Sequence, residues 1–160
     1  MDKKLLSLIE NDATLTADEL AILLGENKEA VAERIKELEN NGTILSRQAL
    51  IDWDKTDREY VTAFIEVKIQ PQRDCGFDKV AERIYNYPEV KSLYLMSGGF
   101  DFVVMIEGKT MREVALFVSQ KLATIEFVTS TSTHFVLKKY KDKGVIYKSP
   151  EIDERGVGGV

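Results

Sequence analysis

The stretch Met96-Ser97-Gly98-Gly99-Phe100-Asp101-Phe102 decides how the larger part of this chain of 160 residues is interpreted. It separates two apolar runs, residues 93–96 and 102–106, that have the length of β-strands. Glycines reach positive φ and allow another backbone or a ligand to approach closely, so Gly-Gly followed by Asp makes a small polar notch. A plain hairpin turn is the simpler interpretation of the same residues. The surrounding pattern has to decide between the two.

Strand and helix patterns alternate on both sides of this loop. The predicted elements lie at residues 60–69, 77–87, 90–97, 100–107, 110–123 and 127–140. The order βαββαβ is that of the ferredoxin-like fold, so the predicted class is α+β. Each helix has one apolar stripe, and two helices cover only one sheet face. Because the middle strands are apolar on both faces, we infer that a second copy packs against the other face.

The first third of the chain predicts a helix-turn-helix at about residues 16–40. Thr16 with Glu19 three residues later is a capping box, which starts a helix that Gly25 ends. Asn27 caps the next helix, whose apolar stripe runs to the Asn-Asn-Gly segment at 40–42. A helix, a short turn with glycine and a second helix are typical of DNA-binding modules, although helical hairpins in general share these features.

The domain boundaries follow from these patterns. Residues 43–45 and 50–53 predict a short extended pair, which would form a wing. The predicted organisation is therefore a winged helix-turn-helix at 1–53, a charged linker at 54–59, a ferredoxin-like domain at 60–141 and a C-terminal tail at 142–160.

Composition narrows the possible functions. No apolar run approaches the roughly 18 residues that a membrane span requires, so we expect a cytoplasmic protein without membrane contact. The chain has one Cys and one His. No metal site, cofactor or nucleophilic dyad is predicted from them, and His134 is interpreted as a packed strand residue. Residues 1–53 carry 6 Lys and Arg against 11 Asp and Glu, so binding of nucleic acid by this part works against repulsion from phosphate.

Three segments together resemble the Lrp/AsnC family of feast-famine transcriptional regulators. They are Asp18-Glu19-Leu20-Ala21 with residues 33–44 after it, the loop Ser97-Gly98-Gly99-Phe100-Asp101-Phe102, and Val128-Thr129-Ser130-Thr131-Ser132-Thr133. Their order and spacing are specific, and the resemblance covers residues 2 to about 141. It implies a non-enzymatic, DNA-binding regulator whose second domain binds an amino acid or related metabolite at oligomer interfaces. It also implies homodimers that assemble further, often to octamers.

The resemblance implies candidate residues for both ligands. On the third helix, the core stripe directs one set of side chains outward, where Lys suits phosphate and Glu can accept from cytosine N4. Arg47, which follows this helix, is a further candidate for phosphate. The residues predicted to contact double-stranded DNA are therefore Lys28, Glu29, Glu33, Lys36 and Arg47. Without the family pattern these charges would be taken for a solvated helix face.

A free amino acid presents an ammonium and a carboxylate, so its site needs an acid together with backbone N–H or hydroxyl donors. The predicted effector site is Ser97, Gly98, Gly99, Phe100, Asp101, Thr131 and Thr133. Two departures from the family stand out: Gly99 occupies a position that is usually acidic, and Glu26-Asn27 replaces the usual Leu-Ser pair.

Two other functions remain open from the sequence. The Glu-rich third helix is compatible with a sensing or assembly protein that has lost DNA binding. The same two-domain organisation also resembles sirohaem decarboxylases, which hold a tetrapyrrole in the sensor cavity. Such an enzyme needs basic and histidine side chains converging on the cavity, and one His with few Arg disfavours it.

Overall fold

A computed structural model describes residues 2–70 and 76–147 of the chain. It divides into two compact units, with the boundary between Asp52 and Trp53. Each unit has its own hydrophobic core.

The first unit consists of three helices: α1 (Asp2–Asn11), α2 (Ala17–Leu24) and α3 (Lys28–Asn40). The predicted capping box is confirmed, because the Glu19 N–H donates to Thr16 Oγ1 at 3.3 Å and the Thr16 N–H donates to the Glu19 carboxylate at 2.8 Å. Gly25 ends α2 in the left-handed region with φ 70°. Asn27 caps α3 by accepting from the Glu29 N–H at 2.8 Å. These local hydrogen bonds satisfy backbone groups at the helix ends and so define the helix-turn-helix.

The wing predicted after α3 does not form as a strand pair. No residue from 43 to 52 belongs to a strand, although the structure describes all of them. Ile44 still contacts the core of this unit, and its N–H donates to the Leu38 carbonyl at 2.9 Å. Leu45, in contrast, is 88% exposed. A two-stranded ribbon without a buried face is at best marginally stable, which accounts for the difference.

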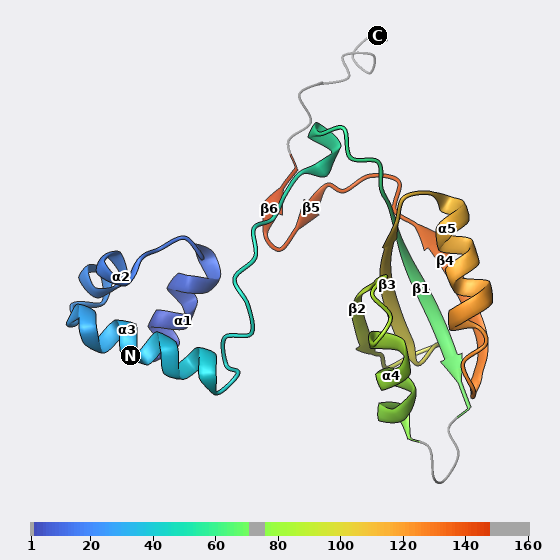
Figure 1. Cartoon of the computed structure of the whole chain (residues 1–160), viewed down its shortest axis with the longest axis horizontal. Helices are drawn as coiled ribbons and strands as arrows, with labels where there is room; N and C mark the ends of the chain where they lie inside the picture. The colour runs from blue at the N-terminus through green and yellow to red at the C-terminus, as the bar shows by residue number, and fades with distance from the viewer. Residues whose placement is uncertain (1, 71–75, 148–160) are drawn as a thin grey trace, which may run out of the picture. The chain divides into compact units, whose positions relative to one another are not determined.

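The second unit is a four-stranded antiparallel sheet in the order β2-β3-β1-β4. Two helices, α4 and α5, lie on the same side of it (Figure 1). The elements are β1 (Val61–Ile69), α4 (Phe77–Tyr85), β2 (Val90–Leu95), β3 (Phe102–Gly108), α5 (Met111–Phe117) and β4 (Val128–Phe135). This confirms the predicted α+β class and the ferredoxin-like order of elements.

The core of the second unit lies between the sheet and the two helices. In β1, Ala63, Ile65 and Val67 are fully buried and alternate with residues of the other face. They pair with Phe135, Thr133 and Thr131 of β4 on one side and with alternate residues of β3 on the other. The helices contribute the buried residues Val80, Ile84, Val114, Phe117, Val118 and Leu122. We call the sheet face away from the helices the open face.

The end of the second unit differs from the prediction. The last strand ends at Phe135 instead of residue 140, because Phe135 already pairs with Ala63, near the start of β1. Residues 118–122 form a π-helical turn rather than a continuation of α5. A small hairpin, β5 (Lys141–Asp142) with β6 (Val145–Ile146), occupies part of the predicted tail. Residues 148–160 of that tail lie outside the described residues.

The segment predicted as a linker is attached to the second unit. The Arg58 guanidinium lies 4.3 Å from the centre of the Trp53 ring and 5.9 Å from that of Tyr60. The Lys139 ammonium lies 5.2 Å from the same Tyr60 ring, and the Tyr60 hydroxyl donates to Asp54 at 3.3 Å. Burial raises the pKa of Tyr60 to about 12. Most of these contacts lie within residues 53–60, and the contact of Lys139 with Tyr60, together with the ion pair of Arg58 with Glu107 at 3.9 Å, joins the segment to this unit.

Candidate nucleic-acid interface and effector site

Helix α3 exposes one row of charged side chains. Its buried stripe is Val31, Ile35 and Leu38. Because α-helical residues three and four apart share a face, this stripe turns the predicted DNA-contacting residues of α3 outward. The four candidates on α3 are all exposed: Lys28, Glu29, Glu33 and Lys36. The fifth candidate, Arg47, follows the helix and is exposed as well.

Two of the three cations predicted to contact DNA form ion pairs. Lys28 Nζ lies 2.8 Å from Asp18 Oδ1 of α2, and Arg47 Nη2 lies 3.2 Å from Glu39 Oε1 of α3. The hydrogen bond to Asp18 raises the pKa of Lys28. Lys36 has no ionic partner within the described part of the chain. The sequence motifs alone contain no signal for these pairings.

Arg34, which is not among the residues predicted to contact DNA, has a structural role. Its Nε and Nη2 donate to the two carboxylate oxygens of Asp2 at 2.9 and 2.6 Å, and its Nη1 donates to Glu37. The bidentate contact connects α3 to the start of α1. These hydrogen bonds lower the pKa of Asp2.

In the second unit, Asp101 fastens the glycine loop to β1. Its N–H donates to the Val67 carbonyl at 3.0 Å, and its carbonyl accepts from the Met96 N–H at 2.8 Å. Its Oδ2 accepts from the Ile69 N–H at 2.8 Å, where the pairing of β1 with β4 shifts register. One carboxylate oxygen of Asp101 is thus used by the protein itself. An ammonium ligand would meet an acid that is already hydrogen-bonded.

The glycines leave the loop open. Gly98 has φ 143°, a conformation that side-chain-bearing residues rarely adopt. A Cβ on Gly98 or Gly99 would meet no atom within 4 Å. Ser97, Gly98 and Gly99 are exposed, whereas Phe100 and Asp101 are partly buried. The loop therefore has room for a ligand beside it.

The two threonines predicted at the effector site do not lie beside this loop in one chain. Thr131 pairs with Val67 and Thr133 with Ile65, both across β1. Strand β1 separates β4 from β3, so the loop before β3 and the threonines are about two strand spacings, or about 10 Å, apart across the sheet. The strand order, which the motifs do not specify, causes this separation.

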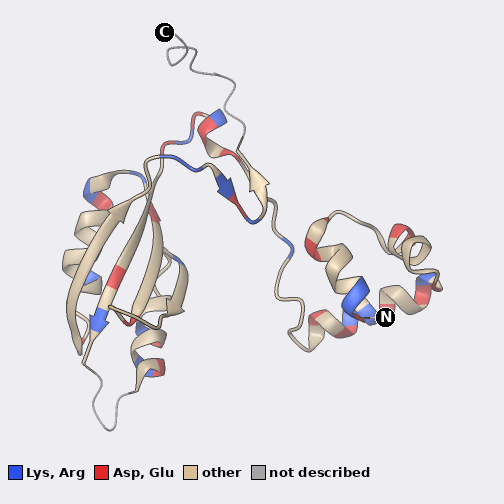
Figure 2. Cartoon of the chain, turned by 180° about the vertical axis from the view of Figure 1, so that it is seen from behind, with Lys and Arg blue, Asp and Glu red and all other residues tan. Residues whose placement is uncertain are grey.

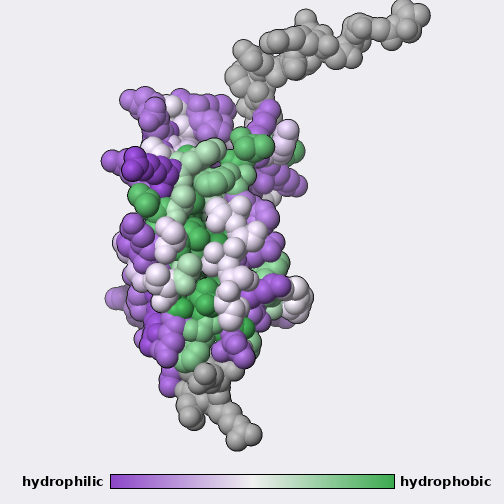
Figure 3. Space-filling model, turned by 90° about the vertical axis from the view of Figure 1, so that its right-hand side faces the viewer, coloured by the Kyte–Doolittle hydropathy of each residue, from purple (hydrophilic) through white to green (hydrophobic). Residues whose placement is uncertain are grey.

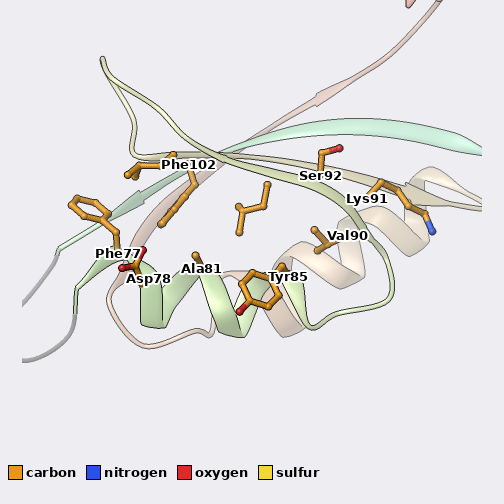
Figure 4. Close-up of a pocket in the computed structure, with 10 residues that line it drawn as sticks. Phe77, Asp78, Ala81, Tyr85, Val90, Lys91, Ser92 and Phe102 are labelled. Carbon is orange, nitrogen blue, oxygen red and sulfur yellow. The ribbon is translucent and has the colours of Figure 1, made fainter. Parts of the chain in front are cut away.

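A groove that was not predicted from the sequence lies between α4 and β2 (Figure 4). Its volume is about 370 Å³, within the range of small-molecule sites. Most of its lining residues are apolar, while Asp78 and Lys91 lie toward opposite ends in Figure 4. The spacing of Phe77, Ala81 and Tyr85, four residues apart on α4, was a signal that could have indicated it.

The open face of the sheet carries apolar and polar side chains. The strands are mostly uncharged in Figure 2, which shows this face. Figure 3 views the side of the unit where α5 and β4 lie, and a band of hydrophobic and weakly polar surface runs there between hydrophilic margins. Phe64 is 40% and Tyr94 57% exposed. His134 is also exposed here, with Nε2 3.3 Å from Glu66 Oε1, so its interpretation as a packed residue is wrong. The β-strand alternation places it opposite Phe64, on the face without helices.

Residues 2–70 and 76–147 hold neither a metal centre nor a membrane-spanning helix. No cluster of His, Cys, Asp and Glu side chains within these ranges could hold a metal ion. No helix in the same residues combines the length and apolarity needed to cross a membrane.

Both units match known families. Residues 1–44 match the model of a winged helix-turn-helix DNA-binding domain, and residues 62–146 match that of the Lrp/AsnC ligand binding domain. The HTH-type transcriptional regulator YugG of Bacillus subtilis is 43% identical over 96% of this chain and 93% of its own length. The HTH-type transcriptional regulator FL11 of Pyrococcus horikoshii is 30% identical over 89% of this chain and 91% of its own.

A solved structure extends the comparison to three dimensions. The transcriptional regulator NMB0573 from Neisseria meningitidis, in a complex with L-Met, has a TM-score of 0.70 and 26% identity. The match covers 87% of this chain and 89% of that one. The likeness thus extends over both units.

The role of Asp101 as an anchor can be tested by unfolding. Asp101→Ala leaves the Ile69 N–H without its acceptor and should lower the free energy of unfolding by about 1–3 kcal/mol in urea denaturation followed by circular dichroism. Asp101→Asn keeps an acceptor oxygen and should recover most of the loss. Ser97→Ala, in the exposed part of the same loop, is the control. Unchanged unfolding of Asp101→Ala would contradict this role.

Proposed function

We propose a mechanism for this chain, which belongs to the Lrp/AsnC family of DNA-binding transcriptional regulators. In this mechanism α3 contacts double-stranded DNA, and an amino acid or related small molecule bound to the second unit controls that contact. One observation carries this mechanism: the same chain contains a capped helix-turn-helix with an exposed face of α3 and a sheet unit that leaves one face open. The chain acts by binding, without catalysis.

The proposed DNA contacts divide by chemistry. Lys36 contacts phosphate oxygens, which position the protein but read no sequence, and Lys28 and Arg47 can do the same when they leave their carboxylate partners. Glu29 and Glu33 accept hydrogen bonds from cytosine N4 in the major groove. Their exposure on one face of α3 supports this division.

We place the effector at the loop Ser97–Asp101, with its ammonium near the Asp101 carboxylate and its carboxylate near the Gly98 and Gly99 N–H groups. The Neisseria relative is described as a complex with L-Met, which supports an amino acid as the ligand class. Because β1 separates the loop from Thr131 and Thr133 within one chain, and both threonines pair with the helix-facing Val67 and Ile65, they would contribute from a neighbouring protomer that approaches along the edge strand β4 rather than across the open faces. The site is then completed only in the oligomer.

The proposed oligomer begins with a dimer in which two open faces pack against each other. Phe64 and Tyr94 are exposed there, and burying them removes apolar surface from water. A twofold interface of this kind is self-complementary. Further assembly of such dimers, up to an octamer, would bring several helix-turn-helix units to one DNA and raise avidity.

DNA binding is tested on the fragment upstream of the chain's own coding region. We expect a footprint at about 50 mM salt that weakens steeply by about 200 mM, because phosphate contacts release counterions. Lys36→Gln should weaken binding and reduce the salt slope by about 0.9 for each phosphate that is no longer neutralised. Lys109→Gln, the same charge change in the second unit, is the control. Absence of any footprint at low salt would remove DNA from the proposal and leave a sensing or assembly protein.

The effector site is tested by the thermal shift that each member of an amino-acid panel produces. Asp101→Asn removes the negative charge and retains an acceptor for the Ile69 N–H, so the fold should persist while the shift is lost. Asp78→Asn, in the groove between α4 and β2, is the matched control and should keep the shift. A shift that Asp101→Asn leaves unchanged would reject this site, and a shift that only Asp78→Asn abolishes would move it to the groove.

The dimer is tested with two tyrosines of almost equal exposure, Tyr94 at 57% on the open face and Tyr85 at 56% on α4. By sedimentation at micromolar concentration, the parent and Tyr85→Lys should be dimers or larger. Tyr94→Lys should shift toward monomer, because it places a charge in the buried interface. A monomeric parent would disprove packing through the open face.

A further inference from the structure

The first unit is acidic although it carries the DNA-binding helix. Helices α1 and α3 carry both basic and acidic residues, whereas α2 carries acidic residues and no Lys or Arg (Figure 2). Most cations near α3 are matched with a carboxylate: Lys28 with Asp18, Arg34 with Asp2 and Glu37, and Arg47 with Glu39. Lys36 is the exception within the described residues.

These pairs differ in what they do for the fold. Arg34 joins α3 to α1 with a bidentate contact to Asp2. The Lys28–Asp18 pair is more than half exposed on both side chains. Exposed pairs contribute only about 0–1 kcal/mol to stability. The Arg47–Glu39 pair is also solvent-exposed, with side-chain exposures of 31% and 47%, so neither carboxylate adds much to the stability of this unit through its ion pair.

The same carboxylates have a larger effect on a phosphate. A carboxylate 2.8 Å from Lys28 cancels most of the field of the ammonium at distances near the Debye length of about 8–10 Å. It also occupies the position that a phosphate oxygen would take. Arg47 is in the same situation with Glu39 at 3.2 Å. Each acid competes with DNA for its cation.

We propose that Asp18 and Glu39 set the DNA affinity of this chain by holding Lys28 and Arg47 away from phosphate. The free protein then presents Lys36 as its main phosphate-binding cation on α3, and affinity depends on base contacts and on the number of protomers engaged. This inference rests on the proposed DNA contacts and adds two residues that make no contact with DNA themselves. It also gives the acidity of the first unit a function, because weak binding to arbitrary DNA leaves the chain free for its specific site.

The test measures DNA affinity of the full chain at four or more salt concentrations for the parent, Asp18→Asn, Glu39→Gln and the double variant. The double variant should bind about tenfold more tightly near 100 mM salt. Its plot of log affinity against log salt should be steeper by about 1.8 for each bound protomer, at about 0.9 for each additional phosphate neutralised. A slope equal to that of the parent overturns the proposal, whatever the affinity.

Glu10→Gln is the matched control, because it makes the same charge change on an exposed residue of α1. If Asp18→Asn gains no more DNA affinity than Glu10→Gln does, the effect is one of net charge alone, and the proposal is overturned. A second measurement pairs the residues: Lys28→Gln should cost little in the parent and several-fold in the Asp18→Asn background. If neither the parent nor any variant binds, the proposed function fails with it; binding by the double variant alone supports the inference.

Discussion

The second unit depends on the pairing of β1 with two neighbours at once. β1 lies between β3 and β4, and its residues Ala63, Ile65 and Val67 are completely buried. The central strand supplies hydrogen bonds to both sides and one apolar face to the helices, so the two helices close a single core. The glycine loop is fastened to this same strand, because Asp101 is hydrogen-bonded to Val67 and Ile69.

The position of β1 also shapes the function. The two helices cover one face of the sheet around β1 and leave the other face open, which favours a partner for that face. Strand β1 also keeps the loop and the threonines of β4 apart within one chain. An effector site that uses both must be completed by a second protomer. Ligand binding and assembly would then be coupled, because the ligand contacts more than one chain in the assembled state.

In the first unit, helix capping and ion pairing act at different levels. The capping box and the Asn27 cap position α3 through hydrogen bonds to nearby backbone groups. The ion pairs across the surface add little to that framework. They determine instead how much positive charge remains for DNA. Lys28 and Arg47 each lie beside a carboxylate, whereas Lys36 does not among the described residues.

The sequence by itself determined what depends on neighbouring residues: the helix caps, the strand and helix periods, the glycine loop and the family pattern. These features rest on hydrogen bonds and spacings within a few positions, so they can be read from the order of residues. Only the tertiary structure decided that Asp101 binds Ile69, 32 residues away, that β1 separates the loop from Thr131, and that Lys28 and Arg47 are paired. It also replaced the predicted wing with an exposed segment and ended the last strand at Phe135. In each case the partner is selected by packing between distant segments, and local spacing carries no information about that choice.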